Sequence, residues 1–147
     1  MIFEIIPYSF VLTIHIIAFV LNIGLVVIAD SLGLLWVIGK KETLPANLMQ
    51  CLHKLVWLGL SLSIFTGAIL FSASQEYLLT VPAFYTKMTF VLALVVNSFL
   101  IHKHLETPLK QSFRSVGKKE KRSLLVSGVV STICWAGVVV SAQFLGL

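Results

Sequence analysis

Charged side chains are scarce in this chain, and acidic side chains are the scarcest. Only 12% of the 147 residues are Asp, Glu, Lys or Arg, six of them are acidic, and 58% of the residues are hydrophobic. A soluble globular protein carries about twice that charged fraction. Together with a mean hydropathy of +0.99, this composition predicts an integral membrane protein whose first partner is the lipid bilayer.

The chain also lacks the sequence motifs of several functional classes. Cys51 and Cys134 stand alone in separate apolar runs, so neither a disulfide framework nor a CxxC metal site is indicated. There is no HExxH, no Gly-rich phosphate loop and no GxSxG. The basic residues concentrate in one connector, Lys103 to Arg122, without a nucleic-acid-binding motif. These absences argue against soluble hydrolase chemistry and against nucleic acid as a partner.

Four apolar runs predict the fold. They cover about residues 7–38, 51–72, 83–104 and 123–145, and a bilayer-spanning helix needs about 20 mostly apolar residues. We therefore expect an all-α fold, a single transmembrane domain over residues 1–147 that forms an antiparallel four-helix bundle. The first and third connectors are basic and the second is not, which predicts that both termini are non-cytoplasmic. A homo-oligomer is left open.

Three polar side chains, His15, Asn22 and Asp30, interrupt the first apolar run. At 100° per residue, Asn22 falls about 20° from His15, and Asp30 falls about 60° away on the other side. The three side chains therefore form one polar stripe on an otherwise apolar helix. Ionisable groups at such depth are costly unless they face protein, water or a ligand, so we treat them as candidate functional residues.

A rise of about 1.5 Å per residue sorts the polar groups of the first three helices into two layers. The outer layer holds His15, Thr66 and Lys87. Asn22 and Asn97 lie between the layers, and the second layer holds Asp30, His53, His102 and His104. On the third helix, His102 points about 160° away from His104 and cannot readily join the same site. We expect His15, Asn22 and Lys87 to line one pocket, with Thr66 nearby.

A haem fits this distribution, since helical bundles build cofactor sites from inward-facing side chains and a neutral imidazole ligates haem iron. His15 and His53 differ in depth by roughly two to three turns, so they would share one haem poorly. His15 as a single axial metal ligand, or His53 together with His104, is easier to build. A buried Lys87 could pair with an anionic cofactor group such as a propionate.

Each of these groups also has a purely structural interpretation. His15 could hydrogen-bond across the bundle, Lys87 could extend to the outer headgroups, and Asp30 and His53 could form an interfacial pair. On the fourth helix, a stripe of small residues predicts a close-packing face: Ser127, Ser131, Cys134 and Ser141.

Two segments resemble a known membrane family. His-Ile-Ile-Ala-Phe-Val from His15, and Pro-Ala-Phe-Tyr-Thr-Lys-Met-Thr-Phe-Val-Leu-Ala-Leu-Val-Val-Asn from Pro82, are similar to HemJ-type protoporphyrinogen oxidases and CopD-like copper-resistance proteins. The resemblance implies bound haem b, catalytic roles for His15 and Lys87, and a location in the bacterial inner membrane. The chain departs from the family in having Asp30 in the region of the family's Arg-rich stretch.

Three functions remain open at this point. A haem-associated oxidoreductase would use His15 and Lys87 together, and is the interpretation that we favour. A transport or metal-handling subunit would use the two polar layers as steps along a continuous hydrated path. A non-catalytic membrane scaffold would satisfy each polar group with a neighbouring side chain and leave no cavity.

Overall fold

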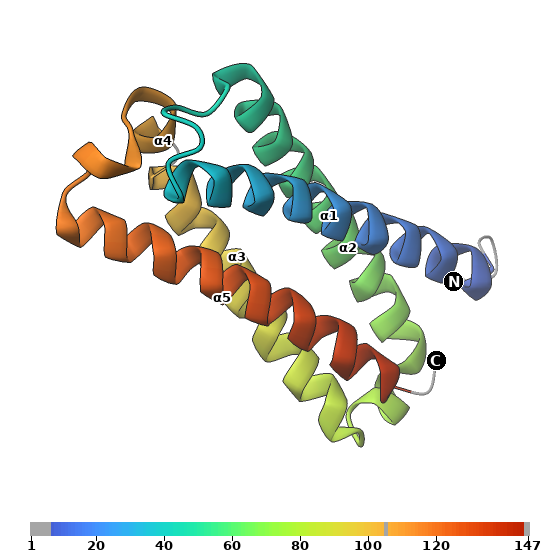
Figure 1. Ribbon diagram of the computed structural model, residues 1–147. Coiled ribbons are helices and arrows are strands. Elements are labelled where there is room, and N and C mark those ends of the chain that lie inside the picture. Colours follow the sequence, from blue (N-terminus) through green and yellow to red (C-terminus); the bar gives the residue numbers. More distant parts are fainter. Residues whose placement is uncertain (1–6, 105, 146–147) are drawn as a thin grey trace.

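The computed structural model describes residues 7–104 and 106–145, and this part of the chain is helical, with no strand. Its elements are α1 (Tyr8–Val37), α2 (Ala46–Leu78), α3 (Pro82–His104), α4 (Glu106–Lys110), η2 (Phe113–Ser115) and α5 (Lys118–Gln143). Four of these helices, α1, α2, α3 and α5, are long and apolar enough to cross a membrane. The predicted all-α class and the four long helices are therefore confirmed, and the helices alternate in direction along the chain (Figure 1).

The predicted bounds of α1 and α3 agree with the structure to within one residue, but those of α2 are wrong. The prediction of residues 51–72 is too short, since α2 begins at Ala46 and ends at Leu78. Pro45 precedes the first turn, where the fixed φ of proline is compatible with a helix start. At the other end, the polar residues Ser74, Gln75 and Glu76 were assigned to a connector, yet they continue the helix across a kink at Ser74.

The bounds of the last helix are also displaced from the predicted 123–145. α5 begins at Lys118, after Gly117, and ends at Gln143. Its first turn is a charged stretch, Lys118 to Arg122, which forms helix although it carries no apolar periodicity. The predicted packing face on this helix is confirmed, since each of its four members is buried: Ser127, Ser131, Cys134 and Ser141.

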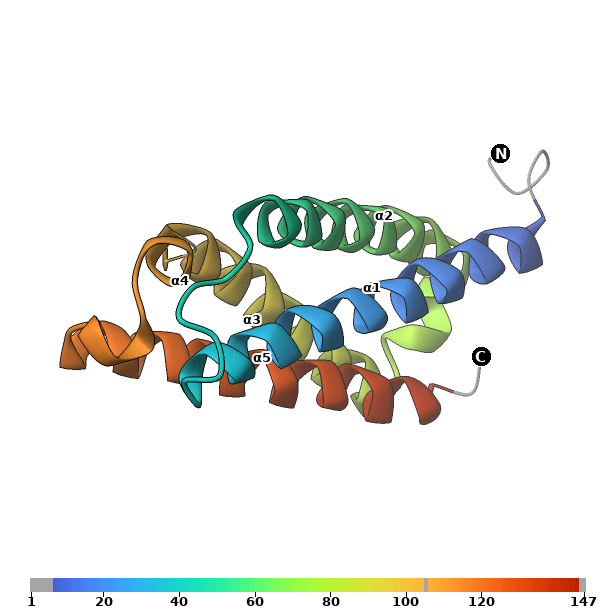
Figure 2. The same cartoon turned by 45° about the horizontal axis from the view of Figure 1, so that its top comes forward.

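The long helices form two hairpins. α1 packs along α2, and α3 packs along α5, whereas α2 and α3 contact each other at few points (Figures 1 and 2). Two glycines allow close approach within the hairpins. A Cβ on Gly59 would lie 2.8 Å from the side-chain amide of Asn22, and a Cβ on Gly137 would overlap the Phe90 ring. Small residues permit such close helix contacts in lipid.

One end of the molecule, which we call the basic end, carries every Lys and Arg except Lys87, in residues 40–54 and 103–122. Here the two hairpins are tied together. The Leu44 backbone N–H donates to Pro108 O at 2.9 Å, and Trp36 Nε1 donates to Gln111 O at 2.9 Å. Trp36 is 3% exposed and meets the Phe113 ring edge-on at 5.1 Å between centroids. The basic end is therefore a packed cap that joins the two hairpins.

Candidate functional site

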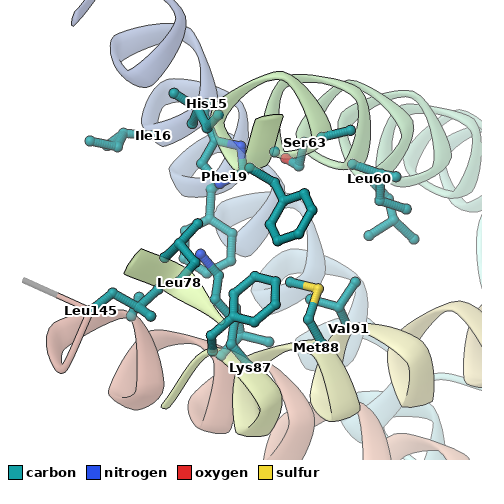
Figure 3. A pocket seen from close by; sticks show the side chains of 18 of the residues that line it. His15, Ile16, Phe19, Leu60, Ser63, Leu78, Lys87, Met88, Val91 and Leu145 are labelled. Atoms are coloured by element: carbon teal, nitrogen blue, oxygen red, sulfur yellow. The ribbon is translucent and has the colours of Figure 1, made fainter. Parts of the chain in front are cut away.

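A cavity of about 390 Å³ lies between the two hairpins, in the half of the molecule opposite the basic end. Side chains from all four long helices line it, as Figure 3 shows, and most of them are apolar. Pockets of about 300–1,000 Å³ with apolar walls and a few polar groups are typical of small-molecule sites. Besides the indole of Trp135 on α5, the polar side chains that line it among the described residues are His15 from α1, Ser63 from α2 and Lys87 from α3.

His15 is fixed by α2 through one of its ring nitrogens. Its Nδ1 lies 2.9 Å from Thr66 Oγ1, and the Thr66 hydroxyl is in turn 2.8 Å from Leu62 O. A hydroxyl has only one proton. Because Leu62 O can only accept, Thr66 donates to it, and Thr66 Oγ1 then accepts from His15. This network assigns the proton of the neutral imidazole to Nδ1 and leaves Nε2 with a free lone pair.

Gly67 makes this position of the His15 ring possible. A Cβ on Gly67 would lie 3.3 Å from His15 Cε1, closer than most side chains tolerate. The ring therefore packs against α2 at Gly67, where there is no side chain, next to the Thr66 hydroxyl that orients it. A hydrogen bond that fixes the tautomer and the orientation of a histidine is the usual support for a metal-ligating or proton-transferring imidazole.

Lys87 is the one cation of the chain outside the basic end, and it is half-buried on α3. Its side chain extends from α3 into the space between the hairpins, with His15 on the α1 side (Figure 3). Within the described residues it has no ion pair or hydrogen bond, and its charge acts on His15. A cation removed from water without an anionic partner is costly by several kcal/mol. The cavity therefore suits an anionic group.

Ser63 is a third polar group of the cavity, and our sequence reasoning missed it. Its Oγ is buried and has no hydrogen-bond partner among the described residues. A signal was available in the sequence, since Ser63 precedes Thr66 by three residues and therefore shares its helix face. It was overlooked because a lone serine in an apolar helix usually bonds to its own backbone.

Asn22 does not line the cavity, so the prediction that it shares a pocket with His15 and Lys87 is wrong. Asn22 is 1% exposed and lies where α1 crosses α2 most closely, against Gly59. With its amide oriented to satisfy its neighbours, it donates to Val56 O at 3.3 Å and accepts from Leu60 N at 3.2 Å. Its role here is a hydrogen bond that holds α1 on α2.

The histidines of the second predicted layer do not form the expected pair. His53 does not meet His104. Instead, His53 Nε2 lies 3.1 Å from His102 Nδ1, and the two rings stack at 5.2 Å between centroids. His104 turns toward α5, where its Nε2 lies 3.3 Å from Ser123 Oγ. His102 and His104 face different helices, as their spacing predicted, but His102, not His104, lies on the side of α2.

Asp30 and His53 are not joined either, since no hydrogen bond or ion pair links them among the described residues. Asp30 is half-buried on α1. The described residues contain no group of three or more His, Cys, Asp or Glu side chains that could hold a metal ion. Neither Asp30, His53 nor His104 lines the cavity, so the two polar layers are separate features of the structure.

Comparisons with known proteins add no relative to this description. No family model matches the chain, and no curated protein or solved structure matches it significantly. The likeness to HemJ-type and CopD-like proteins therefore stays a prediction based on two short segments. The functional argument has to be made from the cavity.

Proposed function

We propose that the protein resides in a membrane and binds a b-type haem or a closely related carboxylated tetrapyrrole between its two hairpins, for use in an oxidoreduction. One observation carries the proposal. Lys87, a cation with no partner among the described residues, and His15, an oriented imidazole, line the same apolar cavity. Lys87 suits an anionic group of the ligand, and the His15 imidazole suits the metal of the ligand.

The residues of the cavity fit a haem in three respects. Apolar side chains from four helices suit the faces of a macrocycle, with Phe19 and Trp135 among them, at 5.6 Å between ring centroids. His15 Nε2 has the free lone pair that iron ligation requires. A charge-assisted hydrogen bond from Lys87 to a propionate is worth roughly 1.5–3 kcal/mol.

Bound haem supplies one-electron chemistry, and the protein supplies its position and surroundings. Thr66 holds the ring of His15 in the orientation and tautomer that leave Nε2 available. Lys87 offsets the negative charge of a carboxylate in a medium of low dielectric constant. The apolar walls exclude water from the site, which strengthens both interactions.

Two other functions receive less support from the geometry. A transport path would have to connect the cavity to Asp30 and His53, and neither of these residues lines it. A scaffold would satisfy its polar groups internally, whereas Lys87 and Ser63 have no partner among the described residues.

An absorption spectrum of protein purified from haem-replete cells tests the proposal. We expect a Soret band that His15→Ala abolishes or strongly shifts, and a haem that Lys87→Met retains more weakly without a change of ligation. The matched control is His102→Ala, because His102 pairs with His53 away from the cavity. Wild-type protein without Soret absorption would reject the proposal. A band that survives His15→Ala would keep the haem and reject His15 as its ligand.

We further propose that the basic end faces the cytoplasm of a bacterial inner membrane, and that both termini lie on the other side. The supporting observation is the segregation of every Lys and Arg except Lys87 to one end, because basic loops are retained in the cytoplasm. A cysteine placed at Gly117, in the connector before α5, should react with a membrane-impermeant thiol reagent only after the membrane is opened. Reaction in intact cells would show that the orientation is the opposite of the one proposed.

A further inference from the structure

Ser63 differs from several other hydroxyls on the long helices. Thr13, Thr89 and Ser141 donate to the carbonyl of the preceding turn, at 2.8, 2.9 and 2.6 Å respectively. This is the ordinary way to satisfy a hydroxyl in an apolar helix. Ser63 Oγ is buried and makes no such bond. A buried hydroxyl without a partner destabilises the ligand-free protein, so its position against the cavity requires an explanation.

The surroundings of Ser63 point to a ligand. Ser63 lies one turn before Thr66, which orients His15, and the His15 ring also lies close to the Ser63 backbone. Figure 3 shows the Ser63 oxygen on the side of the cavity where His15 and Phe19 lie. Ser63 belongs to α2 and Lys87 belongs to α3. These two residues, whose polar groups have no partner among the described residues, therefore come from different hairpins and line one cavity.

We propose that Ser63 is a ligand-binding residue whose hydroxyl donates a hydrogen bond to an acceptor oxygen of the bound molecule. The ligand then has two polar groups on one apolar framework, an anionic group held by Lys87 and an acceptor oxygen held by Ser63. A tetrapyrrole with two carboxylates has this chemistry. The inference rests on the proposed function and extends it, because it adds a second polar contact, from Ser63 to an acceptor oxygen of the ligand, to the contact of Lys87 with an anionic group.

The test uses Ser63→Ala and the control Ser61→Ala, which removes an exposed hydroxyl from the same helix two residues earlier. Each purified full-length protein is unfolded thermally without ligand and is then titrated calorimetrically with two probes, haem b and dodecanedioate. The second probe carries two carboxylates on an apolar chain but no metal. We expect Ser63→Ala to leave the melting temperature unchanged or raise it, because no bond is lost. We expect it to weaken binding of both probes by about tenfold, while Ser61→Ala changes neither property.

The outcomes separate this inference from the proposed function. Equal affinity of Ser63→Ala and wild type for both probes would overturn the role of Ser63 and leave the haem proposal standing. Binding of dodecanedioate but not haem, with a tenfold loss in Ser63→Ala, would overturn the haem proposal and support Ser63. A wild-type protein that binds neither probe would overturn both. A lower melting temperature of ligand-free Ser63→Ala would show that the hydroxyl has an internal partner and would also overturn the inference.

Discussion

The basic end and the cavity differ in how completely the polar groups that join or line the two hairpins are satisfied. At the basic end, the Trp36 indole and the Leu44 backbone both have partners on the connector between α3 and α5. Around the cavity, Lys87 and Ser63 have none among the described residues. The first region holds the two hairpins together by itself. The second leaves two polar side chains without such partners, which the proposed ligand would supply.

This contrast predicts opposite responses to mutation. Removing atoms from the packed basic end leaves a void and a lost hydrogen bond, both of which destabilise the protein. Adding atoms to the cavity fills space that the ligand-free protein leaves open, which stabilises it. Three substitutions test the contrast, and they are ordered here from the largest expected change in stability to the smallest.

Trp36→Ala should have the largest effect. It removes a side chain that is 3% exposed, together with its hydrogen bond to Gln111 O. We expect the free energy of unfolding to fall by about 3–5 kcal/mol, measured by chemical denaturation in detergent. The control is Phe65→Ala, because Phe65 is 66% exposed on the outside of α2. Equal losses in the two variants would show that the basic end is no better packed than the outer surface.

Gly39→Ala should have an intermediate effect at the same end. Gly39 has a φ of +77°, a left-handed conformation that costs a residue with a Cβ about 1–2 kcal/mol. We expect the melting temperature to fall accordingly. Gly33→Ala is the contrast within α1, since a Cβ there meets no atom within 4 Å and alanine favours the helix. A Gly39→Ala variant as stable as wild type would mean that the first connector can change its conformation freely.

Ala142→Leu should have the smallest effect and the opposite sign. Ala142 is half-buried on α5 and lines the cavity. Filling part of the cavity should raise the stability of the ligand-free protein by about 0.5–2 kcal/mol and reduce its capacity for haem. Ala136→Leu adds the same atoms to an exposed position of α5. It should change neither the stability of the ligand-free protein nor its capacity for haem. Loss of stability in Ala142→Leu would contradict the distinction between a packed end and an open one.

Hydropathy was enough to predict the helices, because length and apolarity are local properties of the sequence. Hydropathy did not predict where two of the helices, α2 and α5, begin and end. Ser74 to Glu76 continue α2 although they are polar, since a helix satisfies its backbone with its own hydrogen bonds and needs apolar side chains only where lipid surrounds it. Lys118 to Arg122 begin α5 for the same reason.

The position of a side chain along its helix was easier to predict than the neighbouring helix toward which it points. Counting residues along each helix placed His15, Thr66 and Lys87 at one level, and the structure brings His15 onto Thr66 and both His15 and Lys87 to the cavity. The direction of a side chain relative to a neighbouring helix depends on where the helices cross, which no single helix encodes. Asn22 shares a face with His15, yet it meets Gly59 at the closest approach of α1 and α2.

The pairing of the long helices bears on the biosynthesis of the protein. α1 packs on α2 and α3 packs on α5, so the most extensive contacts join helices that are consecutive long segments of the chain. Local contacts form before distant ones, because they require less loop closure. Each hairpin is therefore expected to assemble as a unit soon after its second helix emerges. The cavity arises only when the hairpins dock, so the newly made first hairpin alone would not retain the proposed ligand.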